Sequence, residues 1–526
     1  MSRKIIAFHA CWVLLLVCTS LPQAVAQANR QPLGVYAHVV IEDLLKQCSG
    51  PPPAAHRCLR NVYARALADP AMAGLTLGAH WDHIQLSDPA CIVTQTCAPG
   101  TVDGYDWSYV DDAFLEATSA HKSVQVIITP GFDFPPWLAA KIPPCDGLFT
   151  VGIVIVPPDC GTVQFQNFPE DQRSDQINGH FVLPLPWNSL YQTAWSDFLR
   201  HLSARYNANP TFISIAIAEP VGGSAEFILP TSDNNDGKGN GNSSQDPSGT
   251  PADRTWATLI AFSFPNATYD YQNSDQVFID QWRQTIDEYE KIFSGVTLFL
   301  GPDAGGDFPE FRWNSTKPFH SDNTLFAEDC SQAIIPPPPP MLPLGDYRSC
   351  EAKTDILSYF VAEVGLNPNV KATQVGGMTA SSATATGNIG VPGVKLLTSL
   401  SPPLLGGAEF DKAVSGSVSD RQFVGCPPNL GPGCTLTIEE AAYYVLANFF
   451  NGTPVATYYG GALGSAPMQY LEVDLQDVQY AQAHPCPTLP SRVPGTPSLQ
   501  DLWNRARHDI LEMAGQTTTL PPPTCP

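Results

Sequence analysis

The chain has 526 residues, of which 15% are charged and 10% are aromatic, and its formal net charge is −23. This surplus of acids excludes nucleic acid and anionic membranes as partners, because binding to their phosphates needs basic patches. An acidic, lightly charged and aromatic-rich chain favours a neutral polar substrate such as an oligo- or polysaccharide.

The first 26 residues predict a signal peptide. Arg3 and Lys4 precede an apolar run from Ile5 to Leu21, and Ala24-Val25-Ala26 supplies the small residues of a cleavage site. No later segment is apolar for long enough to cross a bilayer. The mature chain is therefore expected to be secreted without membrane insertion, into the extracellular space or, in a Gram-negative cell, into the periplasm.

Twelve cysteines remain once Cys11 and Cys18 are assigned to the signal peptide. They fall into pairs that are close in sequence and lack the spacing of a zinc site, so they predict local disulfides in an exported chain, with free buried thiols as the alternative. The predicted pairs are Cys48–Cys58, Cys91–Cys97, Cys145–Cys160, Cys330–Cys350, Cys426–Cys434 and Cys486–Cys525.

Eight apolar or β-branched runs alternate with amphipathic segments along the chain. The runs predict strands at 33–40, 75–81, 124–130, 212–219, 296–300, 373–378, 404–409 and 454–459. The segments between and after them predict helices at about 59–67, 108–120, 189–205, 278–293, 356–364, 438–450 and 502–513. Alternating strands and helices predict an α/β fold, a (β/α)8 TIM barrel that forms a single catalytic domain over 27–526.

Three long insertions rich in Pro, Gly, Asn and Asp interrupt this pattern, at about 139–187, 221–275 and 303–353. Each follows a strand, so each is expected on the face where TIM barrels build their active sites. The predicted disulfides Cys145–Cys160 and Cys330–Cys350 would staple two of them. Long stapled loops on one face favour a walled cleft over decorative insertions.

Two glutamates end predicted strands on opposite sides of the barrel. The fourth strand runs from Phe212 to Glu219 and is stopped by Pro220, and the seventh ends at Glu409. A carboxylate where a buried strand meets a loop is costly unless it is paired or used. Glycoside hydrolysis needs such a pair, one to protonate the leaving oxygen and one to attack the anomeric carbon or activate water. The alternative is a surface acid at each site.

Between residues 74 and 220 the sequence carries three motifs: Tyr105-Asp106-Trp107-Ser108, Ile127-Ile128-Thr129-Pro130 and Pro135-Pro136-Trp137-Leu138. With the strand order, they resemble the clan A glycoside hydrolases, and most closely glycoside hydrolase family 42, the beta-galactosidase type. The resemblance implies a retaining mechanism with Glu219 as acid/base and Glu409 as nucleophile.

One position departs from the pattern of the clan, which has Asn before the acid/base to bond the sugar 2-hydroxyl. This chain has Ala218 there, so the bond must come from elsewhere or be missing. The competitors for the role given to Glu409 are Glu226, in a predicted loop, and Glu363, in a predicted helix.

Further residues at predicted strand ends are candidates for substrate binding. His80-Trp81-Asp82-His83 closes the second strand, and Trp81 or Trp137 could stack on a sugar ring. The alternative for each of these residues is a structural role, in which the aromatic rings pack in the core and the histidines make their hydrogen bonds within the protein. The full candidate set is His80, Trp81, Asp82, Trp137, Asp303 and Tyr458.

The sequence indicates no cofactor and no metal. His80, Asp82 and His83 lie close together, but a barrel metallohydrolase would have His-x-His on its first strand and ligands on later strands, and the sequence has neither. The segment Asp233–Asn242 resembles a calcium loop in composition, but its acids do not alternate as an EF-hand requires, which favours a flexible linker. The predicted function is a secreted retaining glycoside hydrolase; the alternative is an inactive barrel that binds a glycan.

Overall fold

The structure is a computed structural model. It describes residues 30–149, 156–166, 181–222, 225, 227, 229–230, 248–250, 252–265, 276–301, 356, 359–360, 371–378, 405–410, 413–425, 434–449, 468–487 and 497–524. The predicted signal peptide therefore lies outside the described residues.

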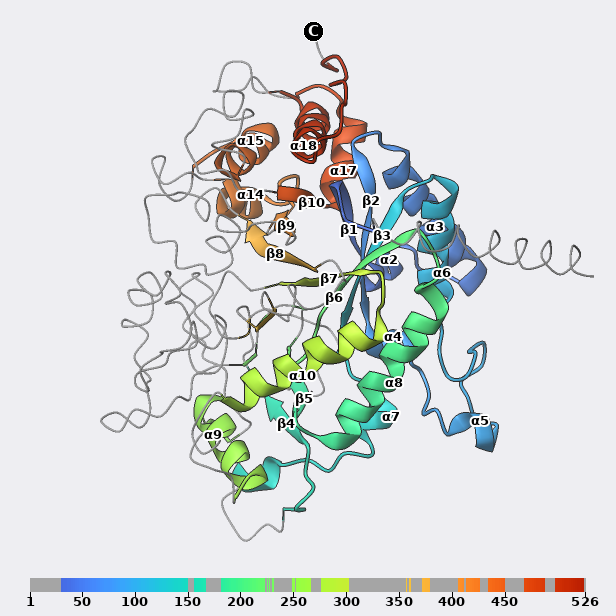
Figure 1. Ribbon diagram of the computed structural model, residues 1–526, viewed down its shortest axis with the longest axis vertical. Coiled ribbons are helices and arrows are strands. Elements are labelled where there is room, and N and C mark those ends of the chain that lie inside the picture. The colour runs from blue at the N-terminus through green and yellow to red at the C-terminus, as the bar shows by residue number, and fades with distance from the viewer. Residues whose placement is uncertain are drawn as a thin grey trace, which may run out of the picture.

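Eight parallel strands close into a barrel, as the sequence predicts (Figure 1). Their order around the barrel is that of the chain, and every neighbouring pair is parallel. The strands are β1 (Gly34–Val40), β2 (Met72–His80), β3 (Ser123–Thr129), β6 (Phe212–Ala216), β7 (Thr297–Leu300), β8 (Lys371–Met378), β9 (Leu405–Phe410) and β10 (Met468–Asp474). All eight C-terminal ends therefore open on one face.

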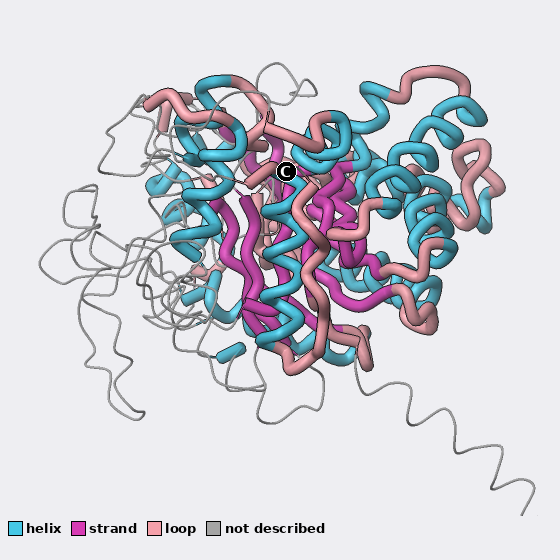
Figure 2. The backbone as a smooth tube through the Cα atoms, turned by 90° about the horizontal axis from the view of Figure 1, so that it is seen from above, coloured by secondary structure: helices cyan, strands magenta, loops and turns pink. Residues whose placement is uncertain are grey.

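Helices surround the strands, which occupy the centre when the molecule is seen from above (Figure 2). The helices of eight or more residues are α3 (Pro52–Ala68), α6 (Ser108–Ser119), α8 (Ser189–Tyr206), α9 (Ala252–Ser263), α10 (Gln276–Ile292), α14 (Val418–Gly425), α15 (Ile438–Phe449), α17 (Leu475–Ala483) and α18 (Leu499–Met513). Shorter turns are α2 (Ile41–Gln47), α4 (Trp81–Ile84), α5 (Cys91–Thr94), α7 (Pro136–Ala139) and the 3-10 turn Asp146–Phe149. The helices α8 and α10 carry buried aromatic side chains, among them Trp195 and Trp282, and lie next to each other (Figure 1).

Side-chain caps set where several helices begin. The Asn188 carboxamide oxygen accepts the first free backbone N–H groups of α8, and the Ser498 hydroxyl does the same for α18. At α15, Thr437 and Glu440 each accept the backbone N–H of the other, which is a capping box. These local signals keep the helix starts close to where the sequence predicts them.

The eighth strand is not where the sequence analysis expected it. The strand that closes the barrel is β10, Met468–Asp474, whereas the predicted segment 454–459 lies outside the described residues. The reason is chemical. One face of β10 carries Glu472 into a polar barrel interior, so the strand lacks the continuous apolar run that a strand buried on both faces usually shows.

The fourth barrel strand is also shorter than expected. Regular pairing ends at Ala216, although the Ile217 backbone N–H still donates to the Phe299 carbonyl at 2.8 Å. The backbone then turns sharply at Glu219, where φ is +131°. Glu219 therefore lies just beyond the strand and not within it.

The first insertion contains a hairpin that the sequence analysis missed. Strands β4 (Thr162–Phe165) and β5 (Phe181–Pro184) pair antiparallel, and the Cys145–Cys160 disulfide pins the loop before them. The second insertion carries α9, and residues 303–353 of the third lie outside the described residues.

Three of the six predicted disulfides are confirmed: Cys48–Cys58, Cys91–Cys97 and Cys145–Cys160. Cys434 and Cys486 are disulfide-bonded as well. The remaining predicted partners lie outside the described residues: Cys330, Cys350, Cys426 and Cys525. In the described part of the chain, no helix combines the length and apolarity needed to cross a bilayer.

Candidate functional site

A cluster of polar side chains lies inside the barrel around Glu409. This residue lies on β9, and its Oε1 is 2.7 Å from Nδ1 of His38 on β1, with both side chains about one-fifth exposed. On the strand between them, β10, Glu472 stands opposite Glu409 in register and is fully buried. Gln125 on β3 donates to Glu472 at 3.3 Å and accepts from Ser214 on β6 at 2.7 Å. The cluster therefore links strands from both sides of the barrel.

Opposing effects act on the pKa of His38. Burial lowers it, but the charge of Glu409 and the hydrogen bond to it, together with the charges of Glu472 and Asp474, raise the pKa to about 9. His38 therefore carries a proton at neutral pH and faces Glu409 as a cation.

This pKa predicts a pH-dependent contribution of His38 to stability. Because the folded-state pKa of about 9 exceeds the unfolded value of 6.5, the contribution is fully present below pH 6.5 and is lost as the pH rises through 9. It amounts to at most about 3 kcal/mol. Urea unfolding of the wild type and of His38→Gln should give a large difference in unfolding free energy at pH 6 and a small one at pH 9.5. An equal difference at both values would contradict the prediction.

Glu219 has surroundings of a different kind. It is only 6% exposed, and burial, reinforced by the negative charge of Glu288 on α10, raises its pKa well above the usual carboxyl value. Its other electrostatic neighbours are Tyr191 on α8 and Tyr289 on α10. Glu219 is therefore a buried carboxyl whose surroundings favour its protonated form.

The two glutamates share one end of the barrel, because Glu219 directly follows the fourth barrel strand and Glu409 lies at the end of the seventh. Their described electrostatic partners differ: those of Glu219 lie on α8 and α10, and those of Glu409 lie on β1 and β10. The competitors Glu226 and Glu363 lie outside the described residues.

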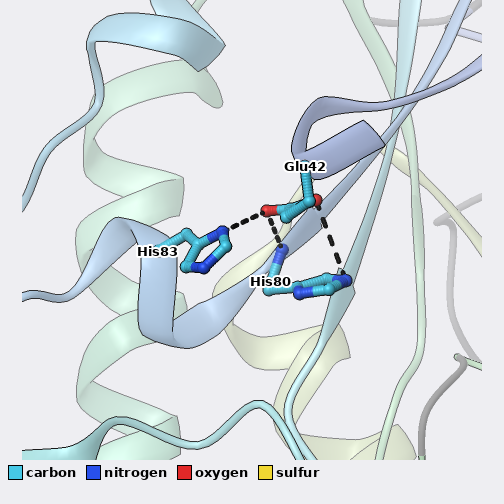
Figure 3. Close-up of side chains that lie close together, drawn as sticks. All are labelled: Glu42, His80 and His83. Carbon is cyan, nitrogen blue, oxygen red and sulfur yellow. Dashed lines mark hydrogen bonds and ion pairs between the residues drawn. The ribbon is translucent and has the colours of Figure 1, made fainter. Parts of the chain in front are cut away.

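A second polar cluster lies over the ends of β1 and β2 (Figure 3). Glu42, in the first turn of α2, is 6% exposed. Its Oε1 accepts from the His80 backbone N–H at 2.9 Å and is 3.1 Å from His83 Nδ1, while its Oε2 is 3.8 Å from His80 Nε2. Burial alone would raise the pKa of Glu42, but the hydrogen bond from His83 and the charge of His80 lower it.

Asp133, in the loop after β3, belongs to this second cluster through its contact with His80. It is fully buried, its Oδ1 is 3.6 Å from His80 Nδ1, and its Oδ2 accepts from the Thr129 hydroxyl at 2.5 Å. The backbone N–H of Asp82 donates to the Asp133 carbonyl. The predicted residues His80, Asp82 and His83 are thus brought together, with two carboxylates that the sequence analysis did not name.

The two tryptophan candidates differ in exposure. Trp81 is fully buried and packs on Trp195 and Phe198 of α8, and its indole N–H donates to Gln85 Oε1 at 2.7 Å. A ring enclosed in this way has no face left for a sugar. Trp137 is half-buried and has Lys141 over its ring at 5.3 Å. The other two candidates, Asp303 and Tyr458, lie outside the described residues.

Sequence reasoning missed four polar residues of these clusters: His38, Glu42, Asp133 and Glu472. A signal existed for three of them, since His38 and Glu472 alternate with apolar residues in strands and Glu42 lies two residues after the end of a strand. Only the closed barrel shows which polar residues meet.

Comparisons with known proteins give remote structural likeness only. No family model matches the sequence, and no curated protein matches it. A beta-galactosidase from the psychrophilic Marinomonas ef1 is 13% identical, over 52% of this chain and 38% of that one, with a TM-score of 0.26. An endo-1,4-beta-mannanase from Rhizomucor miehei is 10% identical, over 79% and 95%, with a TM-score of 0.34. A beta-galactosidase from Halorubrum lacusprofundi is 12% identical, over 92% and 58%, with a TM-score of 0.36.

These neighbours are glycoside-cleaving enzymes by name, and this chain spans well under two thirds of both beta-galactosidases. At such identities and TM-scores they carry no argument about the activity of this chain. The resemblance to glycoside hydrolase family 42 stays a prediction.

Proposed function

We propose that the protein is an exported retaining glycoside hydrolase in which Glu219 is the acid/base and Glu409 is the nucleophile. The observation that carries the proposal is a pair of carboxyls at one end of a closed parallel barrel, one just after the fourth strand and one at the end of the seventh, with different electrostatic surroundings. Pairs of titratable groups held in different protonation states are what acid/base and nucleophile roles require. Export is supported by the disulfides, which form in oxidising compartments.

Glu219 suits proton donation because its burial and the nearby charge of Glu288 raise its pKa well above the usual carboxyl value. A carboxyl with a raised pKa can protonate the leaving glycosidic oxygen at neutral pH. Glu409 suits attack on the anomeric carbon because it lies at the end of the seventh strand, with its Oε1 held 2.7 Å from His38 Nδ1. Water would then release the sugar, with Glu219 acting as the base, so that two inversions give net retention.

The substrate is proposed to be an oligo- or polysaccharide. Asp82, which is partly exposed, would bond sugar hydroxyls, and the half-buried Trp137 would supply an aromatic surface. These side chains follow β2 and β3, so they border the same barrel face as the two glutamates.

The test is a screen of aryl glycosides with the purified full chain, followed by NMR of the first-formed sugar product. Hydrolysis of at least one glycoside with retained anomeric configuration is expected. An inverted product would overturn the double-displacement mechanism, and absence of hydrolysis across the panel would overturn the proposed activity.

Replacing Glu219 with Gln tests the acid role through the leaving group. The variant should lose about 10²- to 10⁴-fold in rate on glycosides with poor leaving groups, and far less on a dinitrophenyl glycoside, whose departure needs no proton. An equal loss on both substrates would contradict the role of Glu219. Unchanged activity would favour Glu472, the buried neighbour of Glu409, as the second carboxyl.

A second candidate function, glycan binding without catalysis, is favoured by Ala218. This residue is fully buried and offers no side-chain amide at the position where the resembled clan bonds the sugar 2-hydroxyl. A binding barrel would retain glycan affinity in the wild type, Glu219→Gln and Glu409→Gln alike, with no turnover in any of them.

A further inference from the structure

We propose that Glu42, His80 and His83 bind one zinc ion at the C-terminal end of the first two barrel strands. Two imidazole nitrogens and a carboxylate oxygen are a ligand set typical of zinc. The candidate ligand atoms of these three residues lie within 4.8 Å of one another, and the two imidazoles flank the Glu42 carboxylate, each facing one of its oxygens (Figure 3).

The distance between His80 Nε2 and Glu42 Oε2 fits a bridging ion better than a direct hydrogen bond, whereas His83 Nδ1 lies within hydrogen-bond distance of Glu42 Oε1. Metal–ligand bonds of 2.0–2.2 Å at tetrahedral angles put neighbouring ligand atoms about 3.4 Å apart. The distance from His83 Nδ1 to Glu42 Oε1 is 3.1 Å, and that from His80 Nε2 to Glu42 Oε2 is 3.8 Å. The second distance is too long for a hydrogen bond, and Glu42 Oε2 is buried with no hydrogen-bond partner among the described residues. An ion between Oε2 and His80 would satisfy this oxygen.

The surroundings also have the form of a metal site. Metal-bound histidines usually direct their second ring nitrogen at a carboxylate. Asp133 Oδ1 lies 3.6 Å from His80 Nδ1, the ring nitrogen that does not face Glu42 Oε2, and the Thr129 hydroxyl donates to the other oxygen of Asp133. The His80 backbone N–H donates a hydrogen bond to Glu42 Oε1 at 2.9 Å and so holds the carboxylate in place.

Charge and access agree with this assignment. Two carboxylates, Glu42 and Asp133, balance the two positive charges of the ion with both histidines neutral. The His83 side chain is 49% exposed, so the ion can enter from solvent and keep water as a fourth ligand. Bound zinc would tie the start of α2 to the end of β2 and to α4.

The test uses the full chain with its disulfides intact and its purification tag removed. The protein is stripped with a chelator, dialysed against zinc chloride and assayed for metal by mass spectrometry. We expect one zinc per chain, a higher thermal midpoint with zinc than without it, and a d–d absorption spectrum of tetrahedral type when Co²⁺ replaces Zn²⁺. Absence of bound zinc, or an octahedral Co²⁺ spectrum, would overturn the proposal.

Matched variants locate the ion. Glu42→Gln and His83→Ala should weaken zinc affinity by at least about 100-fold, and Asp133→Asn by about 10- to 100-fold. His508→Ala is the control, because His508, Asp509 and Glu512 on α18 form another group with metal-ligand spacing. Zinc binding that survives Glu42→Gln and His83→Ala, or that is lost in His508→Ala, would overturn the assignment. No substrate is involved, so the result is independent of the proposed glycosidase activity.

Discussion

Replacing Glu409 with Gln is expected to lower the rate of glycoside hydrolysis by about 10⁴-fold or more while the fold is retained. The amide keeps the shape of the side chain but lacks the negative charge needed to form a glycosyl–enzyme bond. Losses of this size are typical when a covalent nucleophile is removed. The measurement is kcat/KM on the best aryl glycoside of the screen, with circular dichroism to check the fold.

Glu116→Gln is the matched control, because this glutamate lies on the outer helix α6 in a pair with Arg60. It should keep wild-type kcat/KM. If Glu409→Gln retained more than about one hundredth of the wild-type rate, Glu409 could not be the nucleophile.

Replacing Trp81 with Ala is expected to destabilise the protein by about 3–5 kcal/mol, the range for a fully buried tryptophan. The change removes the ring that packs on Trp195 and Phe198 of α8, and it leaves the Gln85 side chain without its indole donor. Trp81 is the first residue of α4, which directly follows β2. The loss of unfolding free energy is therefore expected to come from the packing of this segment on α8. Urea unfolding monitored by tryptophan fluorescence measures it.

Trp137→Ala is the paired variant. Its ring is only half-buried, so a smaller loss of unfolding free energy is expected, while a stacking role would raise KM for the glycoside. Similar stabilities for the two variants, with a raised KM only for Trp81→Ala, would reverse the roles assigned to the two rings.

Local patterns in the sequence were sufficient for most barrel strands and for the main helices. The amphipathic patterns of α8 and α10 each have one dominant periodicity, and the structure follows them closely; the strand that begins at Phe212 was also found, although it ends at Ala216 and not at Glu219. Close spacing of cysteines likewise predicted three disulfides correctly, because a short loop leaves few other cysteines within reach.

The same reasoning failed at β10, which carries Glu472. A strand that contributes to a polar barrel interior alternates polar and apolar residues, so it is hard to distinguish from a surface segment. The Gln125 side chain that makes burial of Glu472 tolerable is separated from it by 347 positions. No local window of sequence contains both.

The sequence by itself determined the fold class, three local disulfides and the position of two glutamates near strand ends, because each depends on neighbouring residues and short-range periodicity. Only the tertiary structure decided that Glu409 faces the His38 cation, that Glu219 is buried beside α10, and that Glu42 lies between His80 and His83. Burial, pairing and pKa arise from contacts between distant segments, and closure of the barrel creates those contacts.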